Sequence, residues 1–172
     1  MKRILFILLF AGIAHAQDAL DFFPGGTYDP KIPTPKSVLG YSIGERFTEY
    51  AALNAFFDKL SASSDRIRRI VYGETNEHRI LQAFIIGTPQ NLARLDGIKK
   101  ANMQLTDPKS LQSNSDSEKI LSTLPIIVWL SYGVHGNEAS SPEAAMVAAY
   151  QLCAGTDSRT RYASRCLRSP HS

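Results

Sequence analysis

The chain has 172 residues, of which 44 % are apolar, so it is long enough for one domain with a hydrophobic core. Its formal net charge of +3 includes two cations next to the N-terminus, and without them 17 basic residues face 16 acidic ones. This balance excludes a strongly basic surface, so we expect no nucleic-acid partner.

The first sixteen residues have the features of a signal peptide. Lys2 and Arg3 form a basic start, an apolar run extends from Ile4 to Ile13, and Ala14-His15-Ala16 fits a small-x-small cleavage site. The apolar run is shorter than the roughly 20 residues that span a bilayer, which favours cleavage over an uncleaved membrane anchor. We therefore expect a secreted or periplasmic protein that is free of the membrane after cleavage.

Turn residues and apolar periodicity divide the rest of the chain into short elements. They predict an extended, proline-rich lead-in over 17–47, a helix over 48–60, strands over 66–72 and 79–87 joined by a turn, a helix over 89–103, a polar loop over 106–118, a strand over 124–130 and a helix over 140–152. This alternation of helices and strands is typical of an α/β fold.

The third predicted strand, Leu124–Leu130, is apolar throughout, which predicts burial on both of its faces. Ser140 and Glu143 have the spacing of a capping box at the start of the helix that follows. The last residues, 158–172, contain several arginines, no acidic residue and no apolar period, and we expect an unstructured basic tail.

A histidine and a glutamate follow the third predicted strand. His135 and Glu138 are three positions apart; the flexible Gly133 precedes them, the flexible Gly136 lies between them, and the capped helix follows. An imidazole and a carboxylate are two of the three protein ligands that a hydrolytic zinc ion needs. The spacing alone is common, and a carboxylate at a helix start is also favoured by the helix dipole. That second interpretation explains Glu138 but not His135.

At these residues the chain resembles the zinc carboxypeptidases of the carboxypeptidase A type. The likeness extends from about Tyr28 to about Asp157 and includes the turn 73–79, the strand 125–130 and the helix after Glu138. It implies the first half of the catalytic domain over 48–157, with a mixed sheet that has helices on both faces. It also implies that His135 and Glu138 bind Zn²⁺, which would activate a water for attack on a peptide carbonyl. The family often has arginine where this chain has Asn137.

The resemblance implies a third zinc histidine, substrate-binding residues and a catalytic glutamate further along, and no residue here is assigned these roles. His78 lies in a predicted turn and His171 in the basic tail, so neither is expected to bind the metal. One hypothesis is that the reading frame is truncated or shifted near residue 159, which would make the tail foreign to the family. We then expect a peptidase-type hydrolase that is inactive as this chain.

Two other interpretations stay open. The segment Val134–Glu138 also resembles the zinc motif of aspartoacylase and succinylglutamate desuccinylase enzymes, which remove acyl groups from amino acids. Those proteins carry the motif close to the N-terminus, which favours the peptidase. The other interpretation is that the chain is a non-catalytic remnant domain.

Of the two cysteines, Cys153 lies on a helical apolar pattern, which favours a buried thiol over a disulfide with Cys166.

Overall fold

The computed structural model describes residues 22–107, 109, 111 and 113–165. The expected signal peptide over 1–16, Cys166 and His171 lie outside these residues. The described elements are α1 (Pro35–Leu39), α2 (Tyr50–Ser63), β1 (Ile67–Glu74), β2 (Ile80–Ile86), α3 (Pro89–Ala93), α4 (Leu95–Thr106), α5 (Asn114–Leu121), α6 (Ser141–Ala154) and α7 (Ser158–Arg165). The predicted α/β class is confirmed. None of the described helices is long and apolar enough to cross a membrane.

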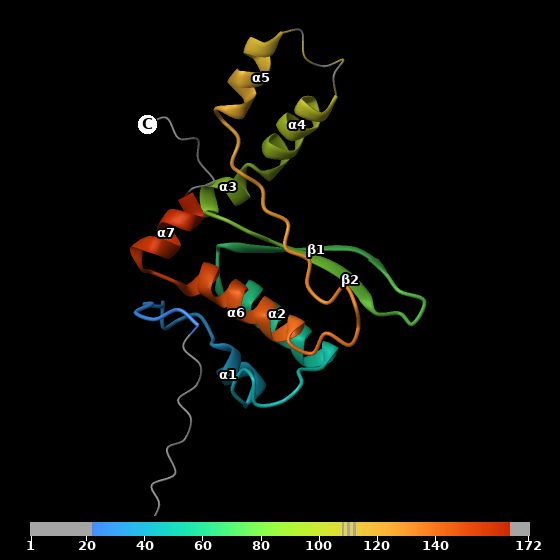
Figure 1. Cartoon of the computed structure of the whole chain (residues 1–172), viewed down its shortest axis with the longest axis vertical. Coiled ribbons are helices and arrows are strands. Elements are labelled where there is room, and N and C mark those ends of the chain that lie inside the picture. Colours follow the sequence, from blue (N-terminus) through green and yellow to red (C-terminus); the bar gives the residue numbers. More distant parts are fainter. Residues whose placement is uncertain (1–21, 108, 110, 112, 166–172) are drawn as a thin grey trace, which may run out of the picture.

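The hydrophobic core lies between α2, α6 and the strand pair (Figure 1). Phe56 and Leu60 on α2 and Met146 on α6 are fully buried. The ring of Phe57 stacks on that of Phe84 in β2, with 4.3 Å between the ring centroids. Each such buried side chain contributes about 1.5–3 kcal/mol to folding, so this cluster holds α6 and the hairpin on the same helix.

The two strands form an antiparallel hairpin, as the sequence predicts. Ile67 faces Ile86 at the open end of the hairpin, and the register shifts between Val71 and Gly73, where β1 has a bulge. The connecting turn includes His78, whose φ is 59°, in the left-handed region. Left-handed backbone is costly for a side chain with a Cβ atom, so this turn has local strain.

The segment between β2 and α6 differs from the sequence prediction at three places, two of which concern its helices. The single helix predicted over 89–103 is divided at Arg94, whose side chain donates hydrogen bonds to Asn91 Oδ1 and to the carbonyl of Thr123. Helix α5 begins within the predicted loop and ends after it, at Leu121; it starts after Ser113, whose hydroxyl accepts a hydrogen bond from the backbone N–H of Asp116. Helices α4 and α5 pack together at one end of the molecule (Figure 1).

The predicted strand Leu124–Leu130 is wrong as a buried strand. This segment is extended, but the described part of the sheet contains β1 and β2 alone, and no strand pairs with the segment there. Residues 126–130 of this segment are exposed, and Trp129 exposes 80 % of its surface. An apolar strand is buried on both faces only when neighbouring strands and helices cover it. The described residues provide no such neighbours, so the segment crosses the surface (Figure 1).

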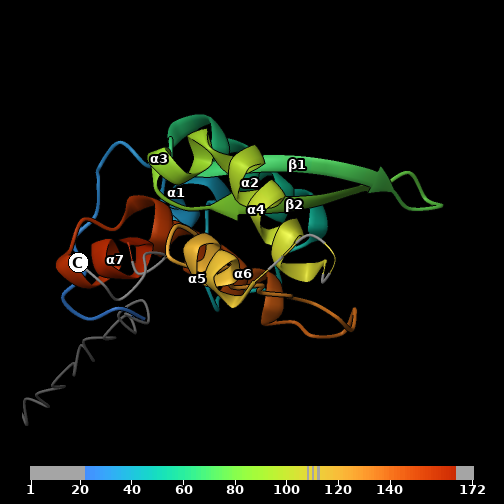
Figure 2. The same cartoon turned by 90° about the horizontal axis from the view of Figure 1, so that it is seen from above.

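The start of the predicted basic tail is also ordered, which corrects the expectation of an unstructured tail. Residues Ser158–Arg165 form α7, which lies next to α6 (Figure 2). Asp157 accepts hydrogen bonds from the backbone N–H of Thr160, at 2.9 Å, and from its hydroxyl, at 2.8 Å. The backbone bond holds the pKa of Asp157 below its usual range. A cap of this kind starts a helix without any apolar period.

Candidate metal centre

The turn before α6 brings together the two residues predicted to bind metal. Gly133 has a φ of 68°, which suits a residue without a Cβ atom, and it allows the chain to turn at the end of the apolar segment. The backbone N–H of Glu138 then donates to the carbonyl of His135, at 3.2 Å, and the N–H of Ser141 donates to the carbonyl of Glu138, at 3.1 Å. These two bonds connect the turn to the first residue of α6.

The side chains of His135 and Glu138 converge. Nδ1 of His135 lies 2.9 Å from Oε1 of Glu138, and the other carboxylate oxygen accepts a hydrogen bond from the Ser141 hydroxyl, at 3.2 Å. The contact with His135 is the main reason that the pKa of Glu138 is lower than usual. The imidazole is 75 % exposed and the carboxylate 39 % exposed, so solvent ions have access to both.

This geometry fits two ligands of one metal ion. Ligand atoms about 2.0–2.2 Å from a tetrahedral zinc ion lie roughly 3.4 Å from each other. The observed separation of 2.9 Å therefore needs to increase by only a few tenths of an ångström to admit the ion. Ser141 satisfies the second oxygen of Glu138, as outer hydrogen bonds do for ligating carboxylates.

A third ligand is not present in the described ranges. No group of three or more histidine, cysteine, aspartate or glutamate side chains in residues 22–107, 109, 111 and 113–165 is arranged to hold a metal ion. His78 lies in the hairpin turn, with its Nδ1 atom 3.2 Å from Oε1 of Glu74, and is largely exposed. The described residues therefore offer the two predicted zinc ligands, His135 and Glu138, and no third ligand beside them.

Comparison with known proteins shows the family of the chain. The family model described as zinc carboxypeptidase matches residues 53–166. The chain belongs to the zinc carboxypeptidase family. The match covers His135, Glu138, the whole of α6 and α7, and it continues beyond Asp157, where the resemblance was expected to end. No curated protein and no solved structure matches the chain. The described fold is consistent with part of a carboxypeptidase-like domain, and the boundaries proposed at residues 47 and 157 stay predictions.

The family match includes the expected site residues but does not test whether they bind zinc. His135 and Glu138 stay the predicted zinc ligands, and Asn137 is exposed next to them. The disulfide expected as one alternative is not tested either, because Cys166 lies outside the described residues. Cys153 itself is buried, and burial raises the pKa of its thiol to about 12.

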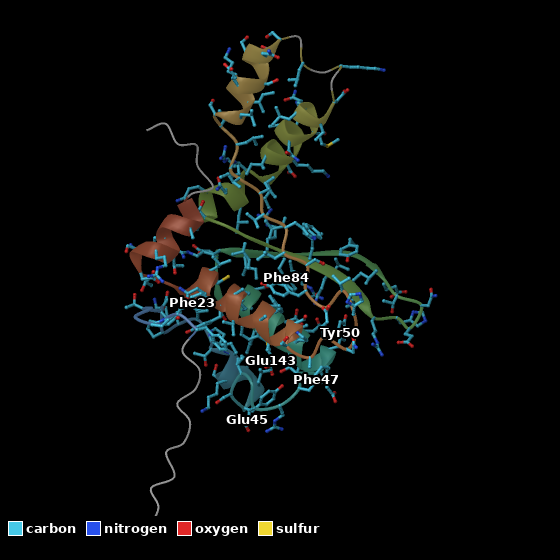
Figure 3. The ribbon with its side chains drawn as sticks, in the orientation of Figure 1. Phe23, Glu45, Phe47, Tyr50, Phe84 and Glu143 are labelled. Atoms are coloured by element: carbon cyan, nitrogen blue, oxygen red, sulfur yellow. The ribbon has the colours of Figure 1, made fainter. Side chains whose placement is uncertain are left out.

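Sequence reasoning missed one residue beside the candidate site. The predicted capping box is wrong, because the side chain of Ser140 makes no capping hydrogen bond and Glu143 is directed elsewhere. The carboxylate of Glu143 is buried and binds the segment that precedes α2 (Figure 3). A Ser-x-x-Glu pattern describes only local spacing, so it carried no signal for a partner nearly a hundred positions away.

Proposed function

We propose that His135 and Glu138 are two of the protein ligands of a zinc site for peptide hydrolysis. The observation that supports this most is the convergence of Nδ1 of His135 and Oε1 of Glu138 to 2.9 Å, within the segment that matches the zinc carboxypeptidase family. The imidazole nitrogen and the carboxylate oxygen are both donor atoms that zinc binds in proteins.

Three residues, His135, Glu138 and Ser141, have a role in this proposal. Zn²⁺, when bound, lowers the pKa of a water and polarises the carbonyl under attack. His135 and Glu138 hold the ion, and Ser141 keeps the carboxylate of Glu138 in one orientation by its hydrogen bond. The exposure of both ligands leaves the remaining coordination positions open to water and to a peptide or protein substrate.

We further propose that this chain binds zinc weakly and does not hydrolyse peptides by itself. Two ligands hold zinc less tightly than three, and the described residues supply no third ligand for this pair. A missing general base removes a contribution of about 10²–10⁴-fold in rate.

We also propose that the chain is exported to the periplasm or the cell exterior after removal of residues 1–16. The family match does not favour acyl-amino-acid hydrolysis.

Zinc titration of the purified chain tests the proposal. Competition with a chromophoric chelator would give the zinc Kd of the parent chain and of the variants His135→Ala, Glu138→Ala and His78→Ala. We expect the first two variants to lose binding and His78→Ala to bind as the parent does, because His78 is exposed in the hairpin turn and contacts Glu74 there. Equal binding by all four proteins would contradict the proposed site. Peptide hydrolysis that requires both zinc and His135 would contradict the expected inactivity.

A further inference from the structure

Glu143 is a buried carboxylate in the first turn of α6, close in sequence to the candidate ligands. Its Oε2 atom accepts a hydrogen bond from the backbone N–H of Gly44, at 2.9 Å. Its Oε1 atom accepts one from the hydroxyl of Thr48, at 3.2 Å. Only 9 % of Glu143 is exposed, and a buried carboxylate is tolerated when such donors satisfy it.

The segment that binds Glu143 is itself ordered by hydrogen bonds and packing. Thr48 is almost fully buried, and its hydroxyl also accepts a hydrogen bond from the Tyr41 hydroxyl, at 2.9 Å. The guanidinium of Arg46 lies over the Tyr41 ring, 4.4 Å from its centroid. Gly44 has a φ of 84°, which lets this loop present its backbone N–H to the carboxylate. The loop over residues 41–48 is therefore a fixed support against which α6 starts.

The start of α6 is connected directly to the candidate metal ligands. The N–H of Ala144 donates to the carbonyl of Ser140, at 2.9 Å, so the residue after Glu143 is bonded to the residue before α6. Ser141 then contacts Glu138 twice, through its backbone N–H, at 3.1 Å, and through its hydroxyl, at 3.2 Å. Movement of this first turn would therefore move the only side chain that donates to Oε2 of Glu138 in the described residues.

We propose that Glu143 is a positioning residue for the His135–Glu138 pair: it ties the first turn of α6 to the loop over residues 41–48 and so holds Ser141 against Glu138. The role in metal binding rests on the proposed zinc site. The effect on the turn does not, because the hydrogen bonds exist without the ion. Glu143 contacts neither candidate ligand, so it acts through Ser141 and the backbone.

Two measurements on the full chain test this inference. The first is amide hydrogen exchange of the metal-free protein at Glu138, Ser141 and Ala144. The second is the zinc Kd, together with the visible spectrum of bound Co²⁺, which reports ligand geometry. The variants are Glu143→Ala, Glu143→Gln and Thr48→Val, because the last two keep the shape of the site if Glu143→Ala does not fold. Ala149→Gly is the matched control, since it weakens the buried face of the same helix away from this contact.

We expect Glu143→Ala to accelerate exchange at the three amides and to raise the zinc Kd about 10-fold, the size of effect that outer-shell residues have on metal sites. Glu143→Gln should recover part of the affinity, because one oxygen acceptor remains, and Thr48→Val should give a smaller change in the same direction. The Co²⁺ spectrum should change in Glu143→Ala and stay as in the parent in Ala149→Gly.

Two results separate the failure of this inference from that of the zinc site. If the Glu143 and Thr48 variants match Ala149→Gly in zinc Kd and in exchange, while His135→Ala loses zinc, the positioning role is wrong and the zinc site stands. If the parent and His135→Ala bind zinc equally, the zinc site is wrong. In that case faster exchange in Glu143→Ala supports the positioning of the turn, and unchanged exchange overturns it as well.

Discussion

Nδ1 of His135 and Oε1 of Glu138 form a hydrogen-bonded pair, and this contact lowers the pKa of Glu138. A carboxylate with a lowered pKa favours the folded turn above its unfolded pKa of about 4.5, and this contribution is lost as the pH falls through the folded pKa. We expect Glu138 to titrate below 4.5 by NMR, and His135→Ala to raise its midpoint. Ser141→Ala should raise it less, because the His135 contact is the larger cause. An unchanged midpoint in His135→Ala would contradict the contact.

Leu60 on α2 is completely buried, whereas Leu121 on α5 is largely exposed. Leu60→Ala should lower the free energy of unfolding by about 2–5 kcal/mol, because it leaves a cavity in the core cluster. The same substitution at Leu121 should change it by less than about 0.5 kcal/mol. Urea denaturation followed by circular dichroism measures both. Similar losses at the two sites would show that the cluster around Leu60 is not the main core.

His78 adopts a left-handed backbone conformation in the turn between β1 and β2. His78→Gly should raise the free energy of unfolding by up to about 1 kcal/mol, because relief of the left-handed strain outweighs the greater flexibility of glycine in the unfolded chain. The lost contact with Glu74 offsets little, since both side chains are exposed. Glu77→Gly is the control: its φ is not positive, so the substitution should destabilise the chain. Denaturant midpoints compare the two variants.

Trp129 is the single tryptophan of the chain, and it lies on the exposed apolar segment before the candidate site. We expect its fluorescence to have the emission of a water-exposed indole and to be quenched efficiently by acrylamide in the native state. A blue-shifted, poorly quenched emission would instead support a strand buried on both faces. Trp129→Ser should leave the unfolding free energy within about 0.5 kcal/mol of the parent, because the side chain has little packing to lose.

Cys153 is buried in α6, and desolvation raises the pKa of its thiol to about 12. The thiolate is the reactive form, so at pH 8 the native protein should react with iodoacetamide much more slowly than the unfolded protein. The variant Cys166→Ser makes the measurement specific for Cys153. Mass spectrometry before and after addition of urea would quantify the modified fraction. Fast alkylation of the native variant would contradict the burial of Cys153.

The parts of the fold that the sequence predicts well depend on neighbours along the chain. The helical period of α2 places Phe56, Phe57 and Leu60 on one buried face. The hairpin is encoded by two apolar segments and a polar turn, and its register is antiparallel as expected. The break at Arg94 was not predicted, because it involves the carbonyl of Thr123 in a later segment.

The candidate site divides in the same way. Residues 135 and 138 meet because one turn of backbone brings positions three apart together, and the spacing in the sequence is sufficient to predict this. Glu143 has the spacing of a cap for the same helix, yet it binds Thr48, 95 positions earlier, and Gly44, 99 positions earlier. No local pattern shows whether a glutamate in the first turn caps its own helix or binds a distant loop.

The sequence by itself therefore determined helix α2, the β1–β2 hairpin, the turn that joins His135 to Glu138, and membership of the zinc carboxypeptidase family. Only the tertiary structure decided where Glu143 binds and whether Leu124–Leu130 is covered. The physical reason is range: hydrogen bonds within one turn are set by adjacent residues. Burial of a strand or a carboxylate instead depends on which distant segments pack against it.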